Sequence, residues 1–310
     1  MNRLNDPLVS VVIPTYNRWP MVREAVESVL AQSFRDFELI VVDDGSTDGT
    51  AERLASVRGV TVLRRSRGGP AAARNAGVAR SRGKYVAFLD SDDLWLPRKL
   101  ELQTAYLEAA PEREICQSEE IWLRCGVRVN PKARHRKPSG DIFRRSLDLC
   151  LVSPSAVMMT RELFDRMGGF DESFPVCEDY ELWLRIGARY PVWLLEEPLV
   201  VKRGGHADQL SRSVWGMDRF RVAALAKLLR SGIEGERRRW VAEALERKAA
   251  IVAQGARKRG RLAEAAGYEA LAAGALEEIG DVGRTDSGAR DGAGISPAHS
   301  EPLARLAGAR

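Results

Sequence analysis

The sequence predicts an α/β fold in which a mostly parallel sheet is flanked by helices and followed by a helical C-terminal appendage. Three observations support this prediction. Apolar runs of strand length alternate with segments of helical period over about the first 110 residues. The turns between them are short, and several carry acidic residues. Beyond residue 216 the chain becomes rich in alanine and arginine and keeps only the helical period.

Within the first 110 residues, strands and helices alternate. Short runs rich in β-branched and apolar residues predict strands at 9–13, 37–42, 60–63 and 85–89. The segments between and after them have helical spacing and predict helices at 18–32, about 48–56, 70–82 and 97–109. Pro14 is expected to close the first strand. In parallel sheets of this kind ligands bind beyond the carboxyl ends of the strands, so we expect the functional site there.

The pattern changes after residue 110. We expect one or two strands within 115–129, further strands at 155–159, 192–195 and 199–201, and helices at 143–150, 160–167 and from 178 onwards. The basic segment 130–138 is expected to be a solvated loop, or else a flap that faces an acceptor or a phosphate. Helices are predicted at 222–229, 234–258 and 261–279, with Val241, Leu245, Ile251 and Val252 in their core. Residues 280–310 have almost no large apolar side chains and are expected to be disordered.

The most informative stretch is Asp90-Ser91-Asp92-Asp93, which follows the predicted strand 85–89. At a separation of about 4 Å and an effective dielectric constant near 20, each like-charged pair of carboxylates costs roughly 4 kcal/mol. A bound divalent cation would remove that cost. The alternative is an N-cap for the following helix, because acidic residues also stabilise helix N-termini.

Other predicted strand ends carry polar residues as well. Thr15 and Tyr16 follow the first strand, and Asp43 and Asp44 follow the second. Because the carboxyl ends of parallel strands share one edge of a sheet, these residues should lie near the acidic cluster. This convergence favours a ligand site over a helix cap.

Composition narrows the function classes. The formal net charge is +5 and the pI about 9.1, which suits anionic partners such as nucleotides or phosphorylated lipids. The four cysteines form no C-x-x-C pair and are expected to be free thiols in a reducing cytoplasm. No apolar stretch of about 18 residues occurs, so we expect a soluble protein, in the cytoplasm or at the inner face of the membrane.

Several enzyme classes lack their motifs here. No G-x-G-x-x-G follows the first strand, no G-x-x-x-x-G-K-[ST] occurs, and there is no G-x-S-x-G elbow. A nucleotidyltransferase, which can use a similar sheet and metal-binding acids, remains the alternative enzyme class. It would usually have a glycine-rich basic turn where this chain has Pro14-Thr15-Tyr16-Asn17.

Six segments in order resemble family 2 glycosyltransferases with the GT-A fold, a Rossmann-like α/β fold. The matching segments are VVIPTYN (11–17), VVDDGSTD (41–48), ARNAG (73–77), FLDSDD (88–93), GGFDE (168–172) and EDYELWL (178–184). The resemblance implies an inverting enzyme that moves a sugar from a nucleotide diphosphate sugar to an acceptor hydroxyl, with Mg²⁺ or Mn²⁺ as cofactor. It implies a catalytic domain over 1–215, with a nucleotide-binding half (1–110) and an acceptor-binding half (111–215). The helices of 216–279 and the tail of 280–310 would lie outside that domain.

For the donor, the resemblance implies that Thr15 and Tyr16 contact the nucleobase, Tyr16 by stacking, and that Asp44 accepts a hydrogen bond from it. Arg74 would lie near the phosphates and Asp90 near the ribose or the metal. Pro14 and Ser91 complete the expected donor site. The alternative for Tyr16 is an aromatic side chain in a turn that covers the edge of the sheet. The alternative for Arg74 is a position on the solvated surface of a helix.

For the metal and the acceptor, the resemblance implies that Asp92 and His206 bind the metal and that Asp179 is the general base. Glu178 would orient neighbouring groups or cap the helix that begins there, and the alternative is that Glu178 itself is the base. For His206 the alternative is a residue of a surface loop without a metal. Gly169 and Asp171 would join Glu178 in the sugar or acceptor pocket. Asp93 would be the third acid of the cluster, with a cap for the next helix as the alternative.

The expected partners are a nucleotide sugar, most simply a UDP-sugar, and a saccharide or lipid-linked acceptor of cell-surface polysaccharide or glycolipid synthesis. No Gln-x-x-Arg-Trp follows Asp179, which indicates addition of one sugar per event.

The C-terminal helices are expected to be a packing appendage, with a regulatory bundle or a peripheral membrane contact as alternatives. A non-catalytic nucleotide-sugar-binding protein is a second hypothesis. Nucleic-acid binding is not expected, because it would leave the acidic strand ends unexplained.

Overall fold

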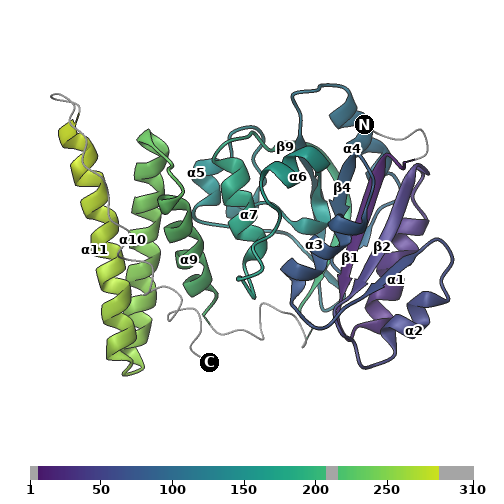
Figure 1. Ribbon diagram of the computed structural model, residues 1–310, viewed down its shortest axis with the longest axis horizontal. Helices are drawn as coiled ribbons and strands as arrows, with labels where there is room; N and C mark the ends of the chain where they lie inside the picture. Colours follow the sequence, from purple (N-terminus) through teal and green to yellow (C-terminus); the bar gives the residue numbers. More distant parts are fainter. Residues whose placement is uncertain (1–5, 207–215, 286–310) are drawn as a thin grey trace. The chain divides into compact units, whose positions relative to one another are not determined.

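The computed structural model describes residues 6–206 and 216–285 and divides the chain into two compact units, Met1–Ser213 and Val214–Arg310. Figure 1 shows that the first unit contains a sheet with helices packed around it, and that the second contains long helices. The α/β fold with a C-terminal helical region is therefore confirmed.

The first unit is built on one curled sheet with the strand order β3-β2-β1-β4-β8-β6-β9-β5, and β7 pairs with β6 at its side. The strands are β1 Val9–Thr15, β2 Phe37–Asp43, β3 Thr61–Arg64, β4 Tyr85–Phe88, β5 Leu94–Trp95, β6 Ile115–Arg124, β7 Val127–Val129, β8 Val157–Thr160 and β9 Trp193–Gly204. Strands β1 to β4 are parallel, whereas β8 runs antiparallel to both β4 and β6. The parallel half thus joins a mixed half.

The helices of this unit connect the strands. They are α1 Trp19–Leu30, α2 Thr50–Ala55, α3 Pro70–Arg80, α4 Lys99–Glu108, α5 Phe143–Ser146, α6 Arg161–Arg166 and α7 Glu178–Gly187, with 3-10 turns at Ala133–His135 and Pro154–Ala156. Thr160 caps α6 as expected, since its hydroxyl accepts a hydrogen bond from the backbone N–H of Leu163 at 3.1 Å.

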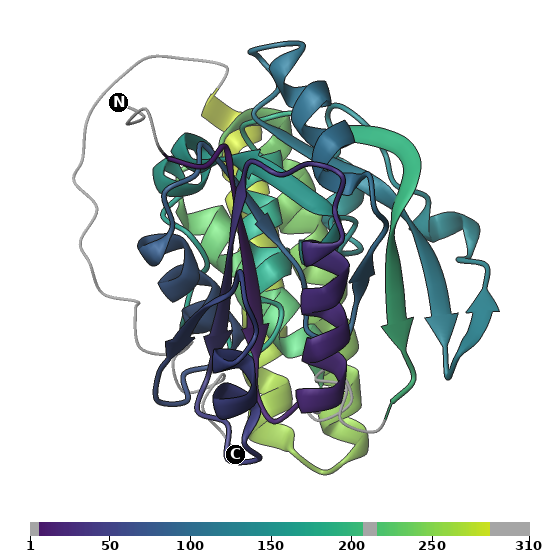
Figure 2. The same ribbon diagram turned by 90° about the vertical axis from the view of Figure 1, so that its right-hand side faces the viewer.

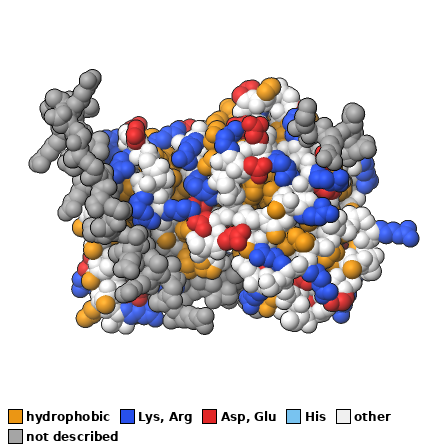
Figure 3. All heavy atoms as spheres, viewed as in Figure 1, with side chains coloured by type: hydrophobic (Ala, Val, Ile, Leu, Met, Phe, Trp, Pro, Cys, Tyr) orange, Lys and Arg blue, Asp and Glu red, His pale blue; other side chains and the backbone are white. Residues whose placement is uncertain are grey.

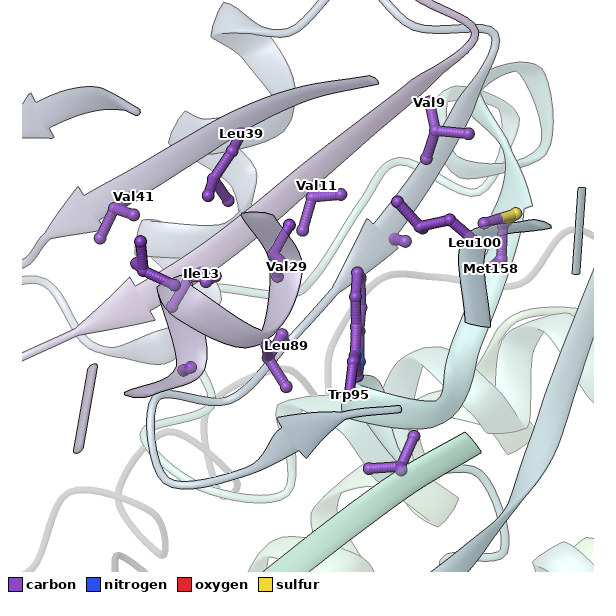
Figure 4. Close-up of a cluster of buried hydrophobic side chains, with 14 of the residues drawn as sticks. Val9, Val11, Ile13, Val29, Leu39, Val41, Leu89, Trp95, Leu100 and Met158 are labelled. Atoms are coloured by element: carbon purple, nitrogen blue, oxygen red, sulfur yellow. The ribbon is translucent and has the colours of Figure 1, made fainter. Parts of the chain in front are cut away.

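Both faces of the sheet are covered, because successive side chains of a strand point to opposite faces. Val9, Val11 and Ile13 of β1 pack in the cluster drawn in Figure 4, together with side chains of α1 and α4 such as Val29 and Leu100. Val12, between them, belongs to the second cluster, which includes residues of α3, α6 and α7. The turned view of Figure 2 shows α1 lying alongside the strands of the parallel half.

Two details differ from the sequence-based prediction. Pro14 does not close the first strand: β1 continues through it to Thr15, whose carbonyl accepts a hydrogen bond from the N–H of Asp44 at 2.9 Å. The short strand β5 was not predicted, because its two residues show no periodicity and it forms only by pairing with β9. The segment 115–129 forms two strands, β6 and β7, joined as a hairpin.

The second unit contains α9 Met217–Arg230, α10 Gly235–Lys258 and α11 Leu262–Thr285 within its described residues. Val241, Leu245 and Val252 are buried in α10, as predicted, but Ile251 is 62% exposed because it lies beside the buried stripe. Helix α11 continues to Thr285, so the expected disorder is wrong for 280–285, and residues 286–310 lie outside the described residues. None of the described helices is long and apolar enough to cross a membrane.

Candidate active site

The acidic cluster lies directly after β4, at the carboxyl end of the parallel strands. Asp90, Asp92 and Asp93 each offer a carboxylate oxygen, and these oxygens all lie within 4.8 Å of one another. A set of carboxylate oxygens without nitrogen or sulfur is the chemistry that Mg²⁺ and Mn²⁺ prefer. The residues present therefore fit a divalent cation of this kind.

Asp93 does not cap a helix. Its carboxylate is buried and accepts hydrogen bonds from the backbone N–H of Arg203 at 2.8 Å and from the hydroxyl of Ser155 at 2.6 Å. Helix α4 begins only at Lys99, and Arg98 caps it without a side-chain hydrogen bond. The capping interpretation is wrong, because the tertiary fold ties Asp93 to β9 and to the turn before β8. Burial, reinforced by Asp92, raises the pKa of Asp93 well above its ordinary value.

One carboxylate oxygen of Asp92 contacts two side chains. Its Oδ2 lies 2.8 Å from Nη1 of Arg18 and 3.0 Å from Nε2 of His206. The structure thus brings His206, at the end of β9, next to the cluster, which disfavours the surface-loop alternative. Its role as a metal ligand stays a prediction.

Arg74 of α3 is buried and bridges two acids. Its Nη2 donates to Oδ1 of Asp90 at 2.6 Å, and its Nη1 donates to Oε1 of Glu178 at 2.7 Å. Burial alone would lower the pKa of Arg74, but the charges of Asp90 and Glu178 raise it above its ordinary value. The solvated-helix interpretation of Arg74 is therefore wrong, and this arginine connects the acidic cluster to the start of α7.

The two acids that begin α7 have different environments. Glu178 is buried, and burial raises its pKa to about 7, with Asp179 adding to the rise and Arg74 opposing it. Asp179 is only partly buried, and its Oδ2 lies 3.6 Å from the Sγ of Cys150. Glu178 is also paired with Arg74, whereas the role of Asp179 as general base stays a prediction.

The expected donor-binding residues gather at the ends of β1 and β2. The Oγ1 of Thr15 is buried and has no hydrogen-bond partner within the described part of the chain, and its contact with a nucleobase stays a prediction. The guanidinium of Arg67 lies 4.1 Å from the ring centroid of Tyr16, so an arginine now stacks where a base is expected. Asp44 accepts hydrogen bonds from the N–H groups of Gly68 and Gly69 at 3.0 and 2.7 Å, which positions the turn before α3. Ser91 is buried between Asp90 and Asp92.

Gly169 and Asp171 shape the loop that leads to α7. Gly169 has φ +70°, and a Cβ built there would lie 2.8 Å from Oδ1 of Asn75, so the position requires glycine. Asp171 accepts hydrogen bonds from the N–H and hydroxyl of Ser173 at 2.9 and 2.6 Å in a local turn. Their part in a sugar or acceptor pocket stays a prediction.

Several polar residues around the site were missed by sequence reasoning. Burial alone would lower the pKa of Lys202 of β9, but the charges of Glu120, Asp93 and Asp90 raise it, and its Nζ donates to the hydroxyl of Ser153 at 3.3 Å. Lys137, expected in a solvated loop, is buried instead, with its Nζ 3.2 Å from Oε1 of Glu120 and 2.7 Å from the carbonyl of Ser118. No short motif contains these residues, because their partners are distant in sequence.

Comparisons with known proteins place the chain in a family. The profile of Glycosyl transferase family 2 matches residues 10–168, about half of the chain, and the profile of Glycosyltransferase like family 2 matches residues 139–221. The chain belongs to glycosyltransferase family 2. The resemblance inferred from the six motifs is thereby confirmed.

Two relatives illustrate the range of this family. An uncharacterized glycosyltransferase of Rickettsia felis is 35% identical over 206 residues, covering 63% of this chain but only 33% of that protein. The chain thus spans about a third of the length of this relative. The UDP-Glc:alpha-D-GlcNAc-diphosphoundecaprenol beta-1,3-glucosyltransferase WfaP of Escherichia coli is 32% identical over 184 residues, covering 58% of this chain and 70% of WfaP.

Solved structures confirm the GT-A fold. S. aureus TarS 1-349 in complex with UDP-GlcNAc superposes with a TM-score of 0.66 at 17% identity, covering 91% of this chain and 93% of that one. The mannosyltransferase PcManGT from Pyrobaculum calidifontis, in complex with GDP-Man and Mn²⁺, has a TM-score of 0.61 at 20% identity, covering 98% of this chain and 79% of that one.

Proposed function

We propose that this glycosyltransferase transfers one sugar per event, with inversion, from a nucleotide diphosphate sugar to an acceptor hydroxyl. One observation carries the proposal: the half-buried carboxylate of Asp179 begins α7, and the adjacent Glu178 is linked through Arg74 to Asp90 of the acidic cluster. The ion pairs Glu178–Arg74–Asp90 thus join the start of α7, where the proposed base lies, to the proposed cation site. A base positioned at the reacting centre is what a single displacement needs.

In this mechanism Asp179 takes the proton of the acceptor hydroxyl as that oxygen attacks the anomeric carbon. The bond from that carbon to the phosphate oxygen breaks on the opposite face, and the nucleoside diphosphate leaves. Asp179 lies in the first turn of α7. Glu178, held by Arg74, orients the helix end rather than taking the proton.

Mg²⁺ or Mn²⁺ would be held by Asp92, with Asp90, Asp93 and His206 beside it. When bound, the ion would neutralise the charge that develops on the departing diphosphate. The Nε2 of His206 lies 3.0 Å from Oδ2 of Asp92, and this position is compatible with His206 as a second ligand of the metal. That TarS and PcManGT were solved with UDP-GlcNAc and with GDP-Man and Mn²⁺ supports both a nucleotide sugar and a metal.

We take UDP as the nucleotide and a saccharide or lipid-linked acceptor as the second substrate. The name of WfaP, with UDP-glucose as donor and a diphosphoundecaprenol-linked acceptor, supports this proposal and a role in cell-surface polysaccharide or glycolipid synthesis. An acceptor on a lipid would bring the protein to the cytoplasmic face of a membrane. The net positive charge supports such a peripheral contact.

The first experiment is a thermal-shift screen of UDP, GDP and dTDP with and without Mn²⁺. The best nucleotide at 100 times its dissociation constant should raise the stability by about 2.7 kcal/mol. Transfer is then measured with the corresponding sugar donors on extracted lipid-linked and free saccharide acceptors. Failure of all donors to transfer, despite nucleotide binding, would favour the non-catalytic nucleotide-sugar-binding alternative.

Two variants test the roles within the site. Asp179→Asn should lower the transfer rate about 10²–10⁴-fold while nucleotide binding is retained, because the amide cannot accept the proton. Asp92→Ala should abolish both transfer and the Mn²⁺-dependent part of the thermal shift. Wild-type turnover by Asp179→Asn would refute the base assignment, and Glu178→Gln would then be the next variant to measure. Family membership already favours sugar transfer over nucleotidyl transfer.

A further inference from the structure

Each carboxylate of the acidic cluster has a cation of the chain beside it. Arg74 contacts Asp90 at 2.6 Å and Arg18 contacts Asp92 at 2.8 Å. The positive charge of Lys202 favours the ionised form of Asp93. Cations of the chain thus act on all three acids.

These cations differ in position. Arg74 pairs with Glu178 at 2.7 Å as well as with Asp90, and so joins the start of α7 to the cluster. Arg18 precedes α1 and follows directly after the segment Pro14–Asn17 at the end of β1. It lies between the segment proposed for the nucleotide and the acid proposed for the metal.

The contact of Arg18 uses the oxygen that a metal would need. Oδ2 of Asp92 accepts from Arg18 and also meets Nε2 of His206. A divalent cation on this carboxylate would stand within a few ångströms of the guanidinium, and the two positive charges repel strongly at such a distance. Arg18 and a metal ion therefore compete for Asp92.

We propose that Arg18 is a positioning residue that competes with the divalent metal for Asp92 and moves to the diphosphate of the nucleotide when both ligands bind. Guanidinium groups bind phosphate oxygens in the same bidentate manner as carboxylates, so the diphosphate offers Arg18 an equivalent partner. The nucleotide then removes the competitor of the metal. Metal and nucleotide consequently bind with positive coupling, and Arg18 transmits it. This inference rests on the proposed use of a nucleotide and a divalent metal.

The test measures Mn²⁺ binding by titration calorimetry to the full chain, without nucleotide and with saturating UDP. Arg18→Ala should bind Mn²⁺ about tenfold more tightly than the wild type without nucleotide. UDP should raise the Mn²⁺ affinity of the wild type, but should raise that of Arg18→Ala much less. Arg18→Gln, which keeps the length of the side chain, should shift in the same direction.

Arg23→Ala is the matched control. Arg23 lies on α1, the helix that Arg18 precedes, is exposed and pairs with Glu27 at 3.2 Å, so its loss removes the same charge away from the cluster. Its Mn²⁺ affinity should stay within twofold of the wild type. Circular dichroism shows whether each variant is folded.

An unchanged or weaker Mn²⁺ affinity in both Arg18 variants would overturn the proposal, as would equal coupling to UDP in variant and wild type. Absence of Mn²⁺ binding to the wild type, with UDP or with GDP, would overturn it too. Failure of the proposed activity is distinguishable: tight, coupled binding of Mn²⁺ and UDP without sugar transfer would refute the activity and leave the role of Arg18 standing.

Discussion

At the scale of single residues, the ionisable side chains inside the first unit divide into paired and unpaired charges. Glu120 lies beside Lys137 and Lys202, and although burial opposes it, their charges lower its pKa to about 2. Lys99, at the start of α4, has no carboxylate beside it among the residues that the structure describes. It is fully buried, donates to Oε1 of Gln103 at 2.5 Å and lies 4.0 Å from the ring centroid of Trp95. Burial lowers the pKa of Lys99 to about 7.

Lys99 should make the free energy of unfolding increase with pH. Between its folded pKa of about 7 and its ordinary value of 10.5, the unfolded chain holds a proton that the folded chain does not. The free energy of unfolding should therefore rise with pH through this window, and the penalty for burying the charge should be complete below pH 7. Lys99→Met should stabilise the protein at pH 6 by a few kcal/mol and flatten the rise.

Urea unfolding at pH 6, 6.75 and 7.5 tests this prediction. This range stays about one pH unit or more below the ordinary pKa of the thiols, whose deprotonation in the unfolded state would add its own slope. Lys132→Met, at an exposed lysine, is the control and should follow the wild type at every pH. A pH dependence in Lys99→Met as steep as in the wild type would show that another group causes it.

At the scale of elements, Arg74 ties α3, the end of β4 and the start of α7 together. Replacing one member of a buried ion pair leaves an uncompensated charge, which typically costs about 3–5 kcal/mol. Arg74→Met should therefore destabilise the protein strongly. In the double variant Arg74→Met with Glu178→Met, much of this loss should be recovered, with a coupling of about 2–3 kcal/mol.

A double-mutant cycle by chemical denaturation measures this coupling. The exposed pair Arg64–Glu52 supplies the comparison, and its cycle should give a far smaller coupling because water screens the charges. Equal coupling in the two cycles would mean that the bridge does not connect the elements energetically. In that case the position of Asp179 would depend on the packing of α7 alone, through side chains such as Trp183.

At the scale of the whole molecule, positive charge is concentrated in one part of the chain. Residues 217–261, which contain α9 and α10, have thirteen lysines and arginines against five acids, whereas the net charge of the entire chain is only +5. On the face shown in Figure 3, basic and acidic side chains are interspersed with hydrophobic ones. The exposed apolar side chains Ile251 and Leu262, 62% and 63% exposed, lie within or next to this basic region.

This distribution leads to a prediction for the proposed membrane contact. Each basic residue near an anionic bilayer contributes about 1 kcal/mol, so the protein should sediment with vesicles of phosphatidylcholine and phosphatidylglycerol and be released by salt. Replacing the exposed Arg247, Lys258 and Arg259 with alanine should weaken binding about 10–100-fold. The exposed cations Arg80, Arg98 and Lys132 of the first unit are the matched control set. Equal loss of vesicle binding in both sets of variants would show that the membrane contact depends on net charge only. Binding of duplex DNA in preference to vesicles would contradict the membrane contact.

The sequence by itself determined the order of strands and helices in the parallel half, the location of the acidic cluster at a strand end and the family. These features follow from local periodicity and from motifs of five to eight consecutive residues, which a reader of the chain can see. Boundaries shifted by one or two residues, as at Pro14 and Asp43, because sheet pairing extends a strand past a local stop signal.

Only the tertiary structure decided which partner each polar side chain takes. Asp93 bonds to β9 rather than to α4, Arg74 is buried between two acids, and Arg18 contacts an acid 74 residues away. Contacts of this range arise when strands distant in sequence, such as β4 and β9, are brought into one sheet. The charges of the site therefore depend on strand order, which local periodicity does not encode.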